Sequence, residues 1–354
     1  MVTIVDYIGY CDLTGEPVGH PVKVINETIE LVLPFERILV AASSKHLEKV
    51  KNRDKIDTTR LNFSICVFSN KKILNLVHKW DNLAKAFNKD TGKVWFINVD
   101  FSLFLYLFLH PNRNDISVIT LCYNPIAHST GWRRRIVTSV LKRAFLVVVT
   151  NSNFLSFIPG NTIYVPDYYY NDELYEKYKS DSKIEQLVCL GTMGETKKLE
   201  ELVSAFAHDN KKLIIAGNFS QNQLRFDNLM HKKTSNIDLI NKRVSNDEYY
   251  HMIANTKYVV LPYDMNLYDE RTSGILLETI FLHSVPIAPK ELLEYNGIKG
   301  IGYDKIDDIP KLLGDEKKID TIINENDALV RTVFSISSIR DKIKNELIGM
   351  DKTR

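Results

Sequence analysis

The chain has 354 residues, of which 46 are basic and 44 acidic, so its formal net charge is only +2. This length favours two domains of ordinary size, each large enough to bury a core without disulfides or metal ions. A charge so close to balance argues against a surface that binds nucleic acid over its whole extent, and we expect no nucleic-acid partner.

The cysteines and the apolar runs indicate the compartment. The four cysteines are widely spaced and form no CxxC or Cys/His cluster, which is typical of buried, reduced thiols in a cytosolic protein. The N-terminus lacks the basic stretch of a signal peptide, and the longest apolar run, residues 101–109, is far shorter than the roughly twenty residues that span a bilayer. We therefore expect a cytoplasmic protein, either soluble or peripheral at the inner face of a membrane.

In the first half of the chain, short β-branched runs alternate with helical patterns, as in a parallel sheet covered by helices. Strands are predicted at residues 3–8, 37–42, 62–68, 93–99, 117–123, 145–150 and 162–165. Helices are predicted at 22–33, 71–88 and 133–143. Between 166 and 183 the alternation stops in a polar, tyrosine-rich stretch, which we interpret as a linker or hinge.

The alternation restarts in the second half. Strands are predicted at 186–190, 212–216, 237–240, 258–261 and 285–288, and helices at 197–208, 247–255, 274–282 and 337–348. The sequence thus predicts an α/β protein with two Rossmann-like, doubly wound domains. The first would span residues 1–170 and the second 171–335, and the C-terminal helical segment 336–354 would pack back on the first. Ligands of such sheets bind beyond the carboxyl ends of the strands, so the strand-to-helix loops matter most.

The stretch 261–278 leads from an apolar strand through a polar loop into an almost wholly apolar helix. A helix N-terminus that follows small residues offers free backbone N–H groups and a partial positive charge, which suit a phosphate or diphosphate. Thr272, Ser273 and Gly274 supply the small residues here.

Two carboxylates flank that helix N-terminus. Glu270 precedes the helix and Glu278 lies inside it, so at a rise of ~1.5 Å per residue they are roughly 10 Å apart. Two carboxylates at that separation cannot act on one atom. They can hold two hydroxyl-bearing ends of an elongated ligand whose anionic middle lies on the helix N-terminus.

A second candidate loop follows the predicted strand 186–190 and contains Gly191 and Lys197. Neither the GxGxxG fingerprint nor the P-loop pattern fits, which argues against a nicotinamide dehydrogenase and a P-loop NTPase. The loop is either an anion clamp or an ordinary turn with a solvated lysine. Further along, Val244 precedes a helix capped by Ser245 or Asn246, whose backbone either frames a flat base or only caps the helix.

These motifs, taken together, resemble the nucleotide-sugar-binding domain of GT-B glycosyltransferases, most of all glycosyltransferase family 4. Four features agree in order and spacing. They are the loop from Gly191 to Lys197, the strand 213–217, the strand 258–262, and the pair Glu270 and Glu278 with seven residues between them, followed by the strand 285–288.

The resemblance implies a role for each donor-site residue. Lys197 would contact the donor diphosphate, Glu270 the hydroxyls of the transferred sugar, and Glu278 the ribose. Backbone N–H groups of residues 272–274 would also bind the diphosphate, and Val244 would lie beside the base.

Two positions depart from the family pattern. The arginine that usually follows the first loop glycine, Gly191, is Thr192 here, and the glycine that often follows the first glutamate is Arg271. Arg271 either replaces the missing cation, since a guanidinium suits bidentate phosphate contact, or pairs with Asp264 or Asp269.

The first half resembles the acceptor domain of the same fold more loosely. Its first predicted strand leads into a glycine-bearing loop with Asp12, Gly15, Gly19 and His20, which in this fold approaches the acceptor and the donor diphosphate. The strand that ends at Tyr123 leads to His128, in a loop similar to the one that faces the donor sugar in many relatives. Each histidine has a purely structural role as its alternative.

The predicted helix 133–143 begins at Arg133, ends at Arg143 and carries an apolar stripe. The stripe is formed by Ile136, Val137, Val140 and Leu141. One interpretation is peripheral membrane contact near a lipid-linked acceptor. The other, which we favour at this stage, is a stripe packed on the sheet beside solvated basic ends.

The function implied by the resemblance is a hexosyltransferase. It would move a sugar from a nucleotide-diphosphate sugar to a glycan or lipid-linked glycan, in bacterial polysaccharide or glycoconjugate assembly. The catalytic residues would be Glu270, His128 and Lys197. No DxD-like pair ends a suitable strand, so we expect no metal and no cofactor.

Retention of configuration is favoured by the resemblance. Inversion would need a general base such as Asp12 or Glu16. A nucleotide-sugar 2-epimerase of the same fold is one alternative function. A non-catalytic GT-B partner subunit is another, although such a subunit would be expected to lose the donor residues.

Overall fold

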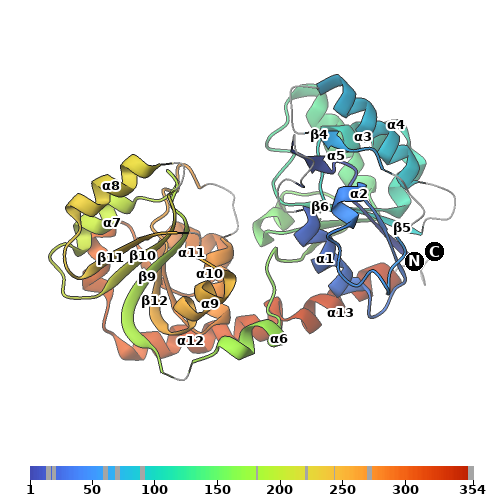
Figure 1. Ribbon diagram of the computed structural model, residues 1–354. Coiled ribbons are helices and arrows are strands. Elements are labelled where there is room, and N and C mark those ends of the chain that lie inside the picture. Colours follow the sequence, from blue (N-terminus) through green and yellow to red (C-terminus); the bar gives the residue numbers. More distant parts are fainter. Residues whose placement is uncertain are drawn as a thin grey trace. The chain divides into compact units, whose positions relative to one another are not determined.

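The computed structural model describes residues 1–12, 17, 21–58, 63–67, 72–87, 92–180, 182–219, 222–242, 244–268 and 273–349. The chain divides into two compact units (Figure 1). The first comprises residues 1–166 together with 339–354, and the second comprises residues 167–338. The C-terminal helix α13 (Ile336–Gly349) therefore begins in the second unit and continues in the first.

The described part of the first unit contains a six-stranded parallel sheet in the order β3-β1-β5-β6-β7-β8. Its strands are β1 (Val2–Val5), β3 (Ile38–Ala41), β5 (Lys93–Phe96), β6 (Ser117–Leu121), β7 (Leu146–Val149) and β8 (Thr162–Tyr164). Every residue of β1, β3 and β7 is buried, as expected for parallel strands that are covered on both faces. A small ladder pairs β2 (Tyr10–Cys11) with β4 (Cys66–Val67). Residues 63–65, which were predicted to belong to the same strand 62–68, are not part of β4.

The described helices of the first unit include two that sequence analysis did not assign. They are α1 (Pro21–Val32), α2 (Ser44–Leu47), α3 (Lys72–Ala86), α4 (Phe101–Leu109) and α5 (Gly131–Arg143). The apolar run 101–109 forms α4, which Asp100 caps by accepting from the backbone N–H of Ser102. An almost uniformly apolar run has no helical periodicity to detect, so only burial in the tertiary structure reveals its state.

The second unit has a six-stranded parallel sheet, among its described residues, in the order β11-β10-β9-β12-β13-β14. Its strands are β9 (Ile184–Thr192), β10 (Leu213–Asn218), β11 (Ile237–Asn241), β12 (Thr256–Val260), β13 (Val285–Pro289) and β14 (Ile301–Tyr303). Its helices are α6 (Asp172–Tyr175), α7 (Leu199–Phe206), α8 (Gln223–Lys232), α9 (Asn246–Ala254), α10 (Gly274–Phe281), α11 (Lys290–Asn296) and α12 (Glu316–Leu329). Sequence analysis missed β14, α6, α8, α11 and α12.

The strand order of the second sheet locates its ligand-binding edge. Counted along the chain, the six strands have the Rossmann order 3-2-1-4-5-6. The order reverses between β9 and β12, from which the chain proceeds outward in opposite directions. Ligands of such sheets bind outside the carboxyl ends of the strands, at this reversal point.

The tyrosine-rich stretch 166–183 begins where the chain passes from the first unit to the second, as a linker would, but most of it is folded into the second unit. Tyr169, Tyr170, Tyr175 and Tyr178 are buried. The ring of Tyr175 lies 5.1 Å from that of Phe281 in α10, and helix α6 forms within the stretch. Tyrosine rings can be buried while their hydroxyls find hydrogen-bond partners, which is why a polar composition was misleading here.

Two further expectations can be compared with the structure. Cys11, Cys66 and Cys189 are buried free thiols, whereas Cys122 is exposed, which corrects the expectation that all four are buried. Within the described ranges, no helix is both long and apolar enough to cross a bilayer.

Candidate functional site

The turn after β9 depends on two glycines. Gly191 has a φ of +99°, a left-handed conformation that favours glycine. A Cβ atom on Gly217, in β10, would lie 1.8 Å from the carbonyl oxygen of Gly191. The ends of β9 and β10 therefore approach more closely than any side chain at position 217 would permit.

Arg225 of α8 holds this turn against α7. Its guanidinium donates to the carbonyl oxygens of Gly194 and Lys197, each at 2.6 Å, and makes a bidentate pair with Glu200 at 2.6 and 2.5 Å. Sequence analysis missed Arg225, because its contacts join residues as far as 31 positions apart. The rigid fork of a guanidinium suits this role, since it satisfies several acceptors at once.

Lys197 lies beside the glycine turn and is only 3% exposed. Its Nζ donates to the carbonyl oxygen of Leu190 and lies 5.7 Å from the ring centroid of Tyr263. A Cβ atom on Gly191 would be 3.5 Å from the same nitrogen. Burial lowers the pKa of Lys197, because a charged ammonium group loses its hydration there.

Backbone hydrogen bonds tie the loop after β9 to the loop after β12. The N–H of Lys198 donates to the carbonyl oxygen of Pro262 at 2.7 Å, and the N–H of Asp264 donates to that of Thr196 at 2.9 Å. Lys197 and Tyr263 form an isolated β-bridge between the two loops. The two loops at the reversal point of the sheet are thus fixed to one another.

The N-terminus of α10 completes this side of the site. Ser273 caps the helix by accepting from the N–H of Leu276 at 3.3 Å, and its Oγ is 3.4 Å from the hydroxyl of Tyr263. A Cβ atom on Gly274 would lie 2.5 Å from the ring of Tyr168, and a Cβ atom on Gly191 would lie 2.8 Å from Ile275. The start of α10 therefore packs directly against the glycine turn, and the ring of Tyr168 lies against it.

Glu278, on the second turn of α10, is 8% exposed. Its Oε2 accepts from the hydroxyl of Tyr249 at 2.5 Å, and its Oε1 accepts from that of Tyr250 at 3.4 Å. Burial, together with the carboxylate charge of Glu278, raises the pKa of both tyrosines, so their hydroxyls stay protonated. Sequence analysis predicted Glu278 but neither tyrosine.

The other predicted donor residues divide into those that the structure describes and those that it does not. Thr192 is exposed at the end of β9, and Val244 is half-buried just before Ser245, which caps α9. Asp269, Glu270, Arg271 and Thr272 lie outside the described residues.

The predicted acceptor residues belong to the first unit. Gly15, Glu16, Gly19 and His20 lie outside the described residues. Asp12 is half-buried directly after β2, and His128 is exposed in the loop after β6, with its ring 6.0 Å from that of Tyr123.

The corresponding edge of the first sheet holds a charged network that sequence analysis did not predict. Asp100 accepts from the hydroxyl of Tyr7 at 2.8 Å and from Nζ of Lys79 at 2.6 Å. Burial alone would raise the pKa of Asp100. Hydrogen bonds from Lys79, Ser102 and Tyr7 outweigh burial, so the pKa of Asp100 is lower than that of an ordinary aspartate.

Three buried polar groups lie at the ends of β1 and β3 in the first unit. The hydroxyl of Ser43 is 2.8 Å from Nδ1 of His46, and that nitrogen is 3.7 Å from a carboxylate oxygen of Asp6. Burial raises the pKa of Asp6 and lowers that of His46, and both shifts favour the uncharged forms.

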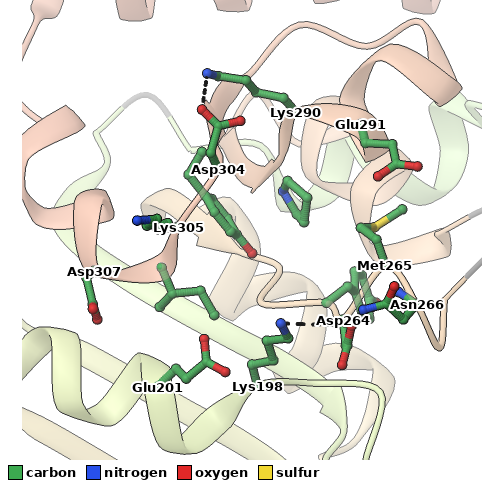
Figure 2. A pocket seen from close by; sticks show the side chains of 14 residues that line it. Lys198, Glu201, Asp264, Met265, Asn266, Lys290, Glu291, Asp304, Lys305 and Asp307 are labelled. Atoms are coloured by element: carbon green, nitrogen blue, oxygen red, sulfur yellow. Dashed lines mark hydrogen bonds and ion pairs between the residues drawn. The ribbon is translucent and has the colours of Figure 1, made fainter.

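A cavity of about 520 Å³ opens at the carboxyl edge of the second sheet, on the side of β13 and β14 (Figure 2). Lys198 lines it 3.9 Å from Asp264, and Lys290 pairs with Asp304 on its far wall. None of the predicted site residues that the structure describes lines this cavity. Adjacent lysines thus have different surroundings, because Lys197 lies buried beside the glycine turn and Lys198 faces the cavity.

No group of three or more His, Cys, Asp and Glu side chains that could hold a metal ion occurs in the part of the chain that the structure describes.

Comparisons with known proteins agree on the architecture. No family model and no curated protein matches the sequence. The crystal structure of HepE from Anabaena in complex with UDP matches with a TM-score of 0.65 and 14% identity, over 99% of this chain and 100% of that chain. A glycosyltransferase from Rickettsia africae matches with a TM-score of 0.66 and 12% identity, over 100% and 99% of the two chains.

A third solved structure, trehalose 6-phosphate synthase from Burkholderia multivorans, matches with a TM-score of 0.62 and 9% identity over 100% and 99% of the chains. At such identities the similarity establishes the fold alone. The chain has the GT-B architecture of two Rossmann-like α/β domains, which confirms the predicted fold class.

Proposed function

We propose that this protein is a glycosyltransferase that transfers a sugar from a nucleotide-diphosphate sugar to a hydroxyl acceptor. The observation that carries the proposal is the convergence of Gly191, Lys197, Ser273 and the start of α10 at the reversal point of the second sheet. The UDP-glucose complex of Anabaena HepE, a protein with the same fold, supports a donor of this class.

Lys197 and the N-terminus of α10 form the anion site of this proposal. Free N–H groups in the first turn of a helix, with the partial positive charge there, attract a diphosphate. A buried lysine with a lowered pKa gains most from such a ligand, because the anion restores the charged form. Arg271 would add a second cation, and Glu270 would bind the hydroxyls of the transferred sugar.

Electrostatic stabilisation of the leaving group is the proposed source of catalysis. Negative charge develops on the diphosphate as the glycosidic bond of the donor breaks, and Lys197 and the helix N-terminus would stabilise that charge. His128 is the third proposed catalytic residue. We propose retention of configuration, which NMR of the anomeric proton of the product tests. We also propose that no metal or other cofactor is needed, and EDTA treatment tests the need for a metal.

The acceptor is proposed to be a glycan or lipid-linked glycan in bacterial glycoconjugate assembly, reached from the cytoplasmic face of the membrane. The apolar stripe of α5 is buried, which leaves its basic face for the membrane contact. That face lines a cavity of about 520 Å³ with Arg134, Arg135 and Lys142. In the described ranges no carboxylate forms an ion pair with these three side chains, and Trp132 beside them is 59% exposed.

Vesicle sedimentation tests this membrane contact. We expect the protein to sediment with vesicles that contain phosphatidylglycerol and not with pure phosphatidylcholine vesicles. Replacement of Arg134 and Arg135 by glutamine should reduce binding, whereas replacement of Lys198 and Lys305 in the second unit should not. Equal sedimentation with both lipids would contradict the proposal.

A screen of UDP-, GDP-, ADP- and dTDP-sugars for thermal stabilisation tests the main proposal. A ligand at a hundred times its Kd adds about 2.7 kcal/mol to the free energy of unfolding. Conversion of a single nucleotide sugar without an acceptor would favour the 2-epimerase alternative. Binding of none of them would favour the non-catalytic partner subunit.

A further inference from the structure

Four separate segments of the second unit line the cavity on the side of β13 and β14 (Figure 2). They are the start of α7, the loop after β12, the end of β13 with the start of α11, and the residues that follow β14. The volume of about 520 Å³ lies within the range of ~300–1,000 Å³ that is typical of small-molecule sites. Of the residues that we assign to the nucleotide sugar, none that the structure describes lines it. The cavity is therefore a candidate site for a second ligand.

Charged side chains of both signs surround this cavity. Three are lysines and five are carboxylates of Asp and Glu. An ion of either sign would meet repulsion as well as attraction there, and an apolar ligand would take these charges out of water without replacing their hydration. A hydroxyl group both donates and accepts hydrogen bonds, so a neutral ligand rich in hydroxyls satisfies lysines and carboxylates alike.

Some of these charged groups are left for a ligand by the protein. Within the described ranges, no side chain forms an ion pair or hydrogen bond with Glu201 or Lys305. Lys198 is only 3.9 Å from Asp264, a distance longer than a hydrogen bond. Figure 2 shows Glu201 and Lys198 on the α7 side of the cavity, across from Asp304. Donors and acceptors thus face the cavity from opposite walls.

The carboxylate of Asp264 is already held in one orientation. Its Oδ1 accepts from the backbone N–H and from the side-chain amide of Asn266, both at 3.1 Å. Its backbone N–H donates to the carbonyl oxygen of Thr196 at 2.9 Å. Its Oδ2 makes no hydrogen bond with any residue that the structure describes. An acceptor fixed in this way loses little conformational freedom when a ligand binds.

A rigid apolar floor lies under the charged rim. Pro289 and the rings of Tyr263 and Tyr303 line the cavity, and both rings are largely buried. The hydroxyl of Tyr303 donates to the carbonyl oxygen of Leu261 at 2.9 Å, and the ring of Tyr263 stacks on that of Tyr268 with centroids 3.9 Å apart. The C–H groups on one face of a sugar ring can pack on such a floor while its hydroxyls reach the charged rim.

We propose that this cavity binds a short neutral stretch of a glycan chain and that it does so without the donor nucleotide. The choice of a glycan among hydroxyl-rich ligands rests on the proposed function, whereas the volume and the mixed charges argue for the site itself. The site holds the enzyme on glycans that carry such a stretch.

Ligand-observed NMR with neutral trisaccharides tests this proposal. Saturation-transfer spectra of the full chain are recorded without nucleotide in the presence of maltotriose, cellotriose, mannotriose or N-acetylchitotriose. We expect at least one of them to bind. Glu201→Ala should raise its Kd about tenfold, because a hydrogen bond to a charged acceptor is lost, and Lys305→Met should raise it at least about threefold.

Two variants of exposed residues outside the cavity are the controls. Glu173→Ala in α6 and Lys311→Met in the segment after β14 should leave the Kd of the trisaccharide unchanged. Glu201→Ala should also leave the affinity for the nucleotide sugar unchanged, since the two ligands occupy different sites.

The outcomes separate this proposal from the proposed function. Failure of every trisaccharide to bind, or a Kd that neither cavity variant changes, would overturn the glycan site. Spermidine and inorganic phosphate are titrated in the same way, and binding of either one that depends on Glu201 or Lys305, without sugar binding, would show that the site takes an ion instead. Sugar binding that depends on both residues, in a protein that binds no nucleotide sugar, would uphold this site and contradict the proposed function.

Discussion

The carboxyl edges of the two sheets are stabilised by different chemistry. In the first unit Lys79 forms an ion pair with Asp100, with 2.6 Å between Nζ and Oδ2. In the second unit Lys197 bonds to a backbone carbonyl, and among the described residues no carboxylate forms an ion pair with it. The first edge therefore neutralises its buried cation internally, whereas the second keeps one available for an anionic ligand. The same substitution at the two lysines should accordingly have opposite consequences.

The largest expected effect is on ligand binding in the second unit. Lys197→Met should weaken binding of the donor diphosphate by roughly 100-fold, since charge-assisted hydrogen bonds to the phosphates are lost. The unfolding temperature should stay the same or rise, because methionine removes a buried charge. Calorimetry and thermal denaturation measure the two quantities. Undiminished binding by the variant would contradict the idea that Lys197 is kept available for an anionic ligand.

In the first unit the corresponding substitution should lower stability. Lys79→Met leaves Asp100 without its cation, and we expect a loss of about 2 kcal/mol in the free energy of unfolding. Urea denaturation measures this loss. Lys85→Met on the same helix, which breaks the more exposed pair with Asp81, is the matched control and should cost less than about 1 kcal/mol. Equal losses would contradict the special role of Lys79.

Arg225 tests whether ligand binding at the carboxyl edge of the second sheet depends on the hydrogen bonds that hold the loop after β9. Arg225→Lys keeps the charge but cannot satisfy two carbonyl oxygens and Glu200 together, so we expect nucleotide affinity to fall about fivefold. Calorimetry measures the affinity. Arg113, which lies over the ring of Phe87 in the first unit, is the control, and Arg113→Lys should leave the affinity unchanged.

The smallest expected effect is a pH dependence. Burial lowers the pKa of Lys197 below the ordinary lysine value of about 10.4. An anion binds the protonated form better, so affinity should fall as pH rises through this lowered pKa. The decline should be absent in Lys197→Met. A wild type whose affinity does not change as the pH rises would show that the lysine does not titrate near the ligand.

The linker expectation shows where composition was misleading. Polar and aromatic residues between 166 and 183 indicated a linker or hinge. The chain does pass between the two units at residues 166 and 167, but the rings of Tyr175 and Tyr178 are buried against α10 and α9. Their hydroxyls satisfy the rule that buried polar groups need partners; that of Tyr178, for example, bonds to Asp247. Nothing local to the stretch specifies those partners.

Sequence by itself determined the two parallel sheets and the positions of the loops that matter. Apolar runs of strand length need only local pattern to be recognised, which is why β9, β10, β12 and β13 were predicted within a few residues. The strand-to-helix pattern also drew attention to Gly191, Lys197 and Glu278, and the family resemblance supplied the roles expected of them. Short β14 and the more polar helices α8, α11 and α12 lacked such a pattern.

Only the tertiary structure decided how those residues are held. Arg225 reaches Gly194 over 31 positions, and Tyr249 reaches Glu278 over 29. A hydrogen bond between such residues depends on the packing of whole helices on a sheet, and no periodicity in the chain encodes it. Local sequence thus fixed which groups lie at the edge of the sheet, while long-range packing fixed their partners, their burial and the direction of their pKa shifts.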